Sequence, residues 1–202
     1  MNLSSLSEPN WPKYYETMAG RPPRNTLLKA LESFSESNFP PYTAVDLGCG
    51  EGRDTVELLK RNWRVLAIDS HVDSFVYLLK NPSLLHPENL TIQLSAFQKV
   101  TWGRVYLVNA SFCLPFCPPE DFSSLWSRIV DSLLTGGRFA GQFFGDRDTW
   151  ATIPGRTHHT LEQVKVLLAP FDLDFWQEEE EDGTALTGAK HWHIFHVVGR
   201  KR

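Results

Sequence analysis

The chain has 202 residues, 42% of them hydrophobic, and a formal net charge of −4. This is enough for one domain with a substantial core, and we expect residues 1–202 to form a single domain. The charge lacks the basic excess that phosphate neutralisation requires, so no nucleic-acid partner is expected. No apolar run reaches signal-peptide or membrane-span length, and an odd cysteine count favours free thiols. Together these features predict a cytoplasmic protein without membrane association.

Along the chain, apolar periodicity predicts an alternation of helices and strands after an irregular, aromatic segment at 1–24. A helix is expected at 26–36, and others at 53–61, 73–80, 119–134 and 160–168. Gly136 and Gly137 are expected to cap the helix at 119–134. Strands are expected at 43–47, 64–68, 90–95, 105–108 and 138–144.

Two final strands, at 172–178 and 191–198, suggest an antiparallel hairpin in which the acidic run 178–182 is a solvated turn. The order of elements therefore predicts an α/β fold with a seven-stranded, mostly parallel sheet.

The most informative segment follows the strand at 43–47. Asp46 is followed by glycines at 48, 50 and 52, and the next strand ends in Asp69. Glycines let the backbone approach a ligand, and an acid at the second strand end can accept both hydroxyls of a ribose. This pattern predicts a pocket for a nucleoside-containing ligand.

The glycine spacing separates two classes of ligand. A dinucleotide turn has the form G-x-G-x-x-G, whereas this chain has G-x-G-x-G with Arg53 in place of the third glycine. Acids at 46, 51 and 54 would repel a pyrophosphate. They suit the sulfonium and ammonium groups of S-adenosylmethionine, so NAD is disfavoured.

The motif V-D-L-G-C-G-E-G-R-D-T at 45–55, with A-I-D at 67–69, resembles the first two motifs of class I S-adenosylmethionine-dependent methyltransferases. The resemblance implies a Rossmann-like three-layer sandwich and S-adenosylhomocysteine as a product. It also implies that the glycine loop lies against the methionine part of the cofactor, with Asp69 on the ribose. The contacts expected here are Asp46, Gly48, Cys49, Gly50, Gly52, Arg53, Asp69 and Ser70.

Further contacts are expected at the ends of the next two strands. Ala96 and Phe97 are placed to bind adenine, although Phe97 could equally be a core residue. In the family, the position of Asn109 borders both the methyl donor and the methyl acceptor. The alternative is that Asn109 only caps the end of its strand. The segment after 108 is not N-P-P-Y, which removes support for methylation of nucleic-acid bases.

The segment at 1–24 resembles the leader of the tellurite-resistance and thiopurine-methyltransferase-like branch. There it acts as a lid, and the catalytic core would be residues 25–202. Tyr15 and Arg21 are the candidate lid contacts, with Arg21 paired to the carboxylate of the cofactor. The alternative is a leader merely packed on the sheet edge.

Few residues suggest catalysis. Asp148 and His158 fall on the expected ligand edge, but a salt bridge within the loop and a helix start explain them as well. His191 and His193 would share a strand face opposite to His196, so no metal site is expected.

Without an evident base, a soft small-molecule acceptor is favoured, such as a thiol or chalcogen species. A noncatalytic S-adenosylmethionine-binding sensor or partner subunit stays open. An NAD-dependent oxidoreductase is a further, weaker alternative. The oligomeric state stays open as well.

Overall fold

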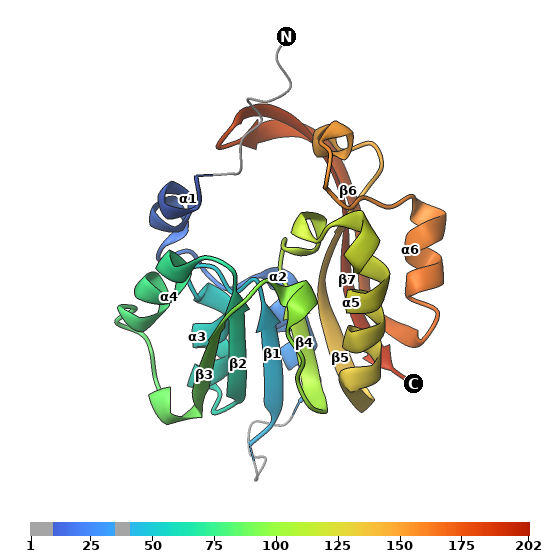
Figure 1. Cartoon of the computed structure of the whole chain (residues 1–202). Coiled ribbons are helices and arrows are strands. Elements are labelled where there is room, and N and C mark those ends of the chain that lie inside the picture. The colour runs from blue at the N-terminus through green and yellow to red at the C-terminus, as the bar shows by residue number, and fades with distance from the viewer. Residues whose placement is uncertain (1–9, 35–40) are drawn as a thin grey trace.

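A computed structural model describes residues 10–34 and 41–202. Its strands form one seven-stranded sheet in the order β3-β2-β1-β4-β5-β7-β6 (Figure 1). The strands β1 to β5 run parallel to one another, whereas β7 is antiparallel to both β5 and β6. The predicted α/β fold with a terminal hairpin is therefore confirmed. The strands are β1 Thr43–Leu47, β2 Arg64–Asp69, β3 Leu90–Leu94, β4 Val105–Ala110, β5 Leu133–Phe144, β6 Phe171–Ala185 and β7 Gly188–Lys201.

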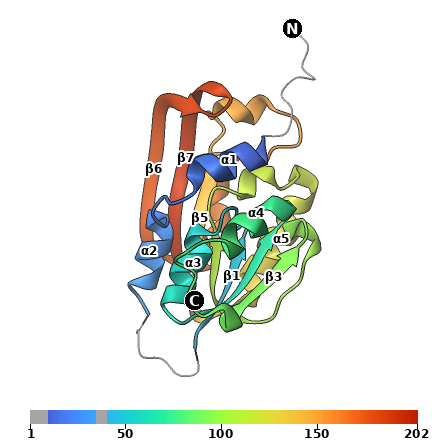
Figure 2. The ribbon, with the colours of Figure 1, turned by 90° about the vertical axis from the view of Figure 1, so that its left-hand side faces the viewer.

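Helices cover both faces of this sheet (Figures 1 and 2). One face carries α2 (Asn25–Leu31), α3 (Arg53–Lys60) and α4 (Val72–Leu79). The other carries α5 (Pro119–Ser132) and α6 (Leu161–Leu167). Short 3-10 turns lie at η2 Pro87–Asn89, η3 Phe97–Lys99, η4 Leu114–Phe116 and η5 Thr149–Thr152.

Alternate residues of the central strands belong to two separate cores. In β4, Val108 packs toward α5, whereas Leu107 packs toward α2 and α3. In β1, Val45 packs on the side of α5 and Ala44 packs on the side of α2 and α3. Because both faces are covered, these strands are continuous apolar runs in the sequence.

The leader differs from the expectation of an irregular segment, because Trp11–Met18 forms helix α1. The side chain of Asn10 accepts a hydrogen bond from the Lys13 amide, and Pro12 lies in the first turn, where it needs no amide hydrogen. The helix lies beside α4, near the carboxyl ends of the strands (Figure 2). The helix expected at 26–36 begins at Asn25 and ends at Leu31, and residues 35 and 36 lie outside the described range.

Two further sequence predictions were wrong at strand boundaries. Gly136 and Gly137 do not cap a helix, because α5 ends at Ser132 and β5 begins at the next residue. A Cβ on Gly137 would lie 2.8 Å from the carbonyl oxygen of Tyr106, so this glycine permits close pairing of β4 and β5. The acidic run 178–182 is not a turn but part of β6, paired with residues 191–195 of β7.

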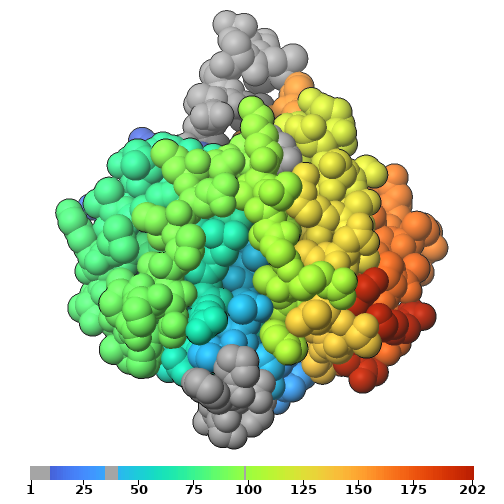
Figure 3. Space-filling model, turned by 60° about the horizontal axis from the view of Figure 1, so that its bottom comes forward, coloured from blue at the N-terminus to red at the C-terminus, as the bar shows by residue number. Residues whose placement is uncertain are grey.

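The connection from β3 to β4 contains only the single turn η3, which packs against α5. Arg128 of α5 donates a hydrogen bond to the carbonyl oxygen of Phe97 at 3.2 Å. Figure 3 shows the chain before β4 (light green) beside α5 (yellow) on the surface. Across the described ranges, no helix has the length and hydropathy needed to cross a membrane.

Candidate cofactor and acceptor pocket

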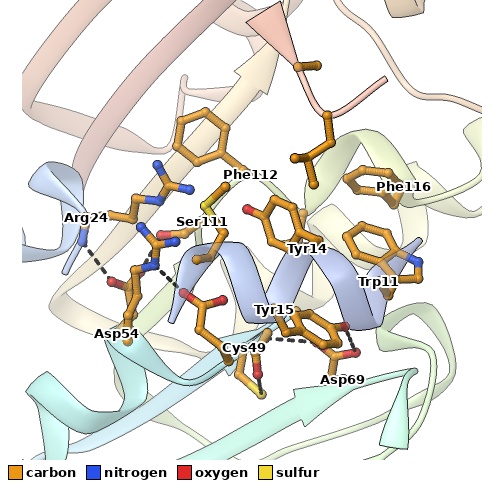
Figure 4. Close-up of a pocket in the computed structure, with 18 of the residues that line it drawn as sticks. Trp11, Tyr14, Tyr15, Arg24, Cys49, Asp54, Asp69, Ser111, Phe112 and Phe116 are labelled. Atoms are coloured by element: carbon orange, nitrogen blue, oxygen red, sulfur yellow. Dashed lines mark hydrogen bonds and ion pairs between the residues drawn. The ribbon is translucent and has the colours of Figure 1, made fainter. Parts of the chain in front are cut away.

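A cavity of about 540 Å³ lies at the carboxyl ends of the parallel strands, covered by α1 and the tip of the β6–β7 hairpin (Figure 4). Its volume falls within the range of small-molecule sites. Two parts differ in chemistry. The acidic half consists of Asp46, Glu51, Asp54 and Asp69, and the aromatic half consists of Trp11, Tyr14, Phe112, Phe116, Phe144, Trp150 and Trp192.

The glycine turn brings β1 against the loop that follows β4. Gly48 has a φ of +61°, in the left-handed region that favours glycine. A Cβ at this position would lie 2.5 Å from the Cβ of Cys113. A larger residue would therefore separate two segments that both line the cavity.

Asp69 ends β2 with its carboxylate held between the glycine turn and α1. Its Oδ2 accepts from the Gly50 amide at 2.9 Å, and its Oδ1 accepts from the His71 amide at 2.9 Å. The Tyr15 hydroxyl approaches the same Oδ1 at 3.4 Å (Figure 4). Burial raises the pKa of Asp69, while these hydrogen bonds oppose the shift. The carboxylate is thus fixed in one orientation at the cavity wall.

Asp46 and Asp54 form a second acidic group around Asn109. The Asn109 amide donates to Asp46 at 2.8 Å and to Asp54 at 3.0 Å. Thr55 donates to Asp46 at 2.5 Å, and Ser111 donates to Asp54 at 2.6 Å. Burial, followed by the charge of Asp54, raises the pKa of Asp46. A cationic ligand group would stabilise this concentration of carboxylates.

Two arginines lie beside the acids. Arg53 Nε donates to Glu51 at 2.6 Å, whereas its buried Nη2 has no hydrogen-bond partner within residues 10–34 and 41–202. The Arg24 guanidinium lies 4.2 Å from the ring centroid of Phe112. Burial and the neighbouring Arg53 lower the pKa of Arg24. Paired guanidinium groups of this kind suit a carboxylate ligand.

The aromatic half is assembled from segments distant in sequence. Trp11 of α1 meets the ring of Phe116 edge-on, with a centroid distance of 5.0 Å. Phe144, at the end of β5, stacks with Trp150 at 6.0 Å, and Trp150 lies 5.9 Å from Trp192 of β7. These rings give the cavity an apolar, aromatic wall.

One acid, Glu179 of β6, lines the cavity together with these rings. Its Oε2 lies 3.0 Å from His196 Nε2 on the neighbouring strand β7. Burial lowers the pKa of His196, and the charge of Glu179 opposes this shift. The Glu179 carboxylate therefore lies within hydrogen-bond distance of His196 while its side chain stays one-third exposed.

Most of the residues predicted to bind the cofactor are brought together around the cavity. Gly52, Ala96 and Asn109 lie outside its lining in the described structure. Gly52 instead packs against Leu78 of α4, and Asn109 is fully buried beneath the acids. The predicted residues that do line it are Tyr15, Arg21, Asp46, Gly48, Cys49, Gly50, Arg53, Asp69, Ser70 and Phe97.

The candidate catalytic residues Asp148 and His158 are placed differently from the expectation. Asp148 is buried and forms an ion pair with Lys190, whose ammonium lies 4.2 Å from the ring centroids of both Trp150 and Trp192. Both ring nitrogens of His158 are buried without a hydrogen-bond partner in the described part of the chain. Neither side chain is among the described residues that line the cavity, because the loop after β5 turns them inward to support its aromatic wall.

The histidines of β7 serve as cross-strand partners. His193 lies beside Glu178 and Glu180, a group of potential metal ligands, but the Arg147 guanidinium occupies the space among them. Its hydrogen bonds lower the pKa of Glu180 to about 2. His196 points to the opposite face, as the strand periodicity predicts.

Sequence reasoning missed much of the aromatic half and Glu179. Trp192 and Ile194 alternate along β7 in the pattern of one strand face, and both line the cavity. That periodicity could have predicted that these two side chains lie on one face of the strand and contribute to the wall of the cavity. Glu179 was obscured by the acidic residues around it.

No protein-family model matches the chain. A carboxy-S-adenosyl-L-methionine synthase from Shewanella amazonensis is 32% identical over 103 residues, which cover 48% of this chain and 42% of the relative. The match thus spans less than half the length of that relative.

Solved structures give broader coverage at lower identity. TehB from Haemophilus influenzae has a TM-score of 0.73 at 15% identity, covering 95% of this chain and 67% of that one. A 1,6-didemethyltoxoflavin-N1-methyltransferase from Burkholderia thailandensis has a TM-score of 0.56 at 19% identity, covering 88% and 78%. The chain therefore has the Rossmann-like fold of class I S-adenosylmethionine-dependent methyltransferases.

Proposed function

We propose that this protein transfers a methyl group from S-adenosylmethionine to a small-molecule acceptor. The orientation of Asp69 is the observation that carries the proposal. Its carboxylate ends β2 at the sheet edge where such folds bind nucleosides, and it faces a cavity bordered by a glycine turn. A carboxylate in this place can accept hydrogen bonds from both ribose hydroxyls.

The remaining residues of the acidic half fit the other groups of the cofactor. Asp46 and Asp54 would stabilise the ammonium and sulfonium charges, while Arg24 and Arg53 would hold the methionine carboxylate. When bound, S-adenosylmethionine supplies an already activated methyl group. The protein then has to align the acceptor and exclude water, and the aromatic half provides a dry surface for both tasks.

The acceptor class is open to two chemistries. A thiol or chalcogen nucleophile needs no general base, and none of the sequence-predicted bases reaches the cavity in the described structure. A nitrogen acceptor is the alternative, because the neighbour from Burkholderia thailandensis is named for methylation at N1. Glu179 is the feature that separates these two classes.

The curated relative suggests a second candidate, the formation or use of carboxy-S-adenosylmethionine. The free Nη2 of Arg53 beside Arg24 favours it, because an additional carboxylate would find a partner there. Mass spectrometry of the nucleoside products distinguishes the two candidates. A carboxylated nucleoside supports the second candidate, and S-adenosylhomocysteine with a methylated acceptor supports the first.

Calorimetry with S-adenosylhomocysteine and with NAD tests the cofactor assignment. We expect micromolar or tighter binding of S-adenosylhomocysteine and no heat from NAD. Binding of NAD alone would contradict the proposal. Binding of S-adenosylhomocysteine without methylation of any acceptor, together with a stable protein partner, would indicate a sensor or partner subunit instead.

A further inference from the structure

We propose that the aromatic half binds a planar acceptor with an N–H group, and that Glu179 accepts its proton during methyl transfer. The inference rests on the proposed function and adds the acceptor class and the base. It favours nitrogen over the thiol or chalcogen acceptor that the sequence suggested.

Glu179 is the acid that β6 contributes to the cavity lining. Its side chain is 33% exposed, so it reaches both the cavity and water. Within the described residues, the polar contact of its carboxylate is Oε2 with His196 Nε2 at 3.0 Å. The second oxygen is left to accept a hydrogen bond from a ligand.

His196 holds this carboxylate in place. The imidazole is 15% exposed and lies beside the ring of Phe112, with a centroid distance of 6.0 Å. With its proton on Nε2, it donates to Oε2 of Glu179, a residue of the cavity lining, and leaves Oε1 without a partner among the described residues. His196 is therefore a positioning residue, and Glu179 is the group that touches the acceptor.

The walls around Glu179 favour a flat, neutral acceptor. Phe144 and Trp150 stack with an interplanar angle of 21°, and the ring of Trp192 lies beside Trp150 at 56° to it. Lys190 already occupies the position of a cation beside both tryptophans, neutralised by Asp148. Stacking of a heteroaromatic ring is therefore favoured over capture of a second cation.

Methyl transfer to nitrogen needs no reactant other than S-adenosylmethionine and the N–H acceptor. The nitrogen lone pair forms the new N–CH3 bond while the methyl–sulfur bond of the sulfonium breaks, and sulfur keeps that bonding pair. The displaced N–H proton passes to the free oxygen of Glu179 and from there to solvent. A thiolate carries no such proton, so thiol methylation would not need this residue.

The test compares Glu179→Gln with the unmodified protein, using S-adenosylmethionine and two sets of acceptors. Benzimidazole, indazole and lumazine represent planar N–H acceptors, and thiophenol and selenide represent soft ones. We expect turnover of at least one N–H acceptor and a loss of about 100-fold or more in kcat in the variant, the usual range for a general base. Affinity for S-adenosylhomocysteine should stay within about twofold, because Glu179 lies outside the acidic half.

Two further variants separate a chemical role from a structural one. Glu181→Gln removes an exposed acid two residues along β6 and should leave kcat unchanged. His196→Ala should lower kcat about tenfold with little change in KM, and His196→Gln, which can still donate, should recover part of that loss.

The proposal fails if Glu179→Gln retains N-methylation, or if the unmodified protein methylates only the soft acceptors. It also fails if S-adenosylhomocysteine binds but no N–H acceptor turns over. Absence of S-adenosylhomocysteine binding in the unmodified protein would instead overturn the proposed function itself.

Discussion

The two halves of the cavity are built in opposite ways. The acidic half comes from a short stretch of chain, from the end of β1 to the end of β2, and its groups are held mainly by hydrogen bonds. The aromatic half combines α1, the loops after β4 and β5, and the terminal hairpin, and it is held by ring packing around a buried ion pair. The acids of one half therefore come from a single stretch of chain, although distant Asn109 and Ser111 hold two of them, whereas the rings of the other half come from several distant segments.

This difference matters for function. The acids of the cofactor site lie on one stretch of chain, whereas an acceptor site on several loops changes with each of them. The two halves should accordingly respond to different mutations.

The largest expected effect concerns the support of the aromatic half. Asp148→Ala leaves the Lys190 ammonium buried without its partner, so the free energy of unfolding should fall by about 3–5 kcal/mol. Urea denaturation measures this loss. The double variant Asp148→Ala/Lys190→Met should recover much of it, because no unpaired charge remains. Equal stability of the single variant and the unmodified protein would show that the pair is not buried in solution.

The acidic half should respond to Asp69→Asn. The amide has one acceptor oxygen and no charge, so two hydrogen bonds to ribose weaken, and affinity should fall about 100-fold. Calorimetry with S-adenosylhomocysteine measures this change. Asp131→Asn, at an exposed position of α5, is the matched control and should bind normally. Unchanged affinity in Asp69→Asn would place the ribose elsewhere.

Gly48 connects the two halves. Gly48→Ala combines an unfavourable φ with a Cβ contact against Cys113, and it should destabilise the protein by about 1–3 kcal/mol. Gly155→Ala is a matched control, because its φ is +78° but its Cβ would meet nothing within 4 Å. The difference between the two melting curves isolates the contact from the backbone strain. If both variants lose equal stability, the close approach of β1 to the loop after β4 is unimportant.

The smallest expected effect involves Tyr15, which belongs to α1 but reaches into the acidic half. Its hydroxyl approaches Asp69 in the place where a ribose hydroxyl would bind. Because hydrogen bonds to charged groups are worth about 1.5–3 kcal/mol and this one is long, Tyr15→Phe should tighten S-adenosylhomocysteine binding only two- to fivefold. Weaker binding in this variant would mean that Tyr15 contacts the cofactor directly.

The sequence alone was sufficient for the fold and for much of the acidic half. Asp46, Gly48, Gly50 and Asp69 surround the cavity as their spacing predicted, because parallel strands bring their carboxyl ends to one edge. The terminal hairpin was also predicted, although both of its strands are longer than expected and its turn does not lie at 178–182.

Only the tertiary structure decided which polar side chains reach the aromatic half. Asp148 follows β5 and Glu179 lies within β6, both near the ligand edge of the sheet. Both side chains end in a carboxylate. A turn after β5 buries Asp148 against Lys190, whereas strand alternation and the pairing of β6 with β7 direct Glu179 into the cavity. Local sequence pattern fixes the groups adjacent to a strand end, but the partner of a side chain from a distant loop depends on how the whole chain packs.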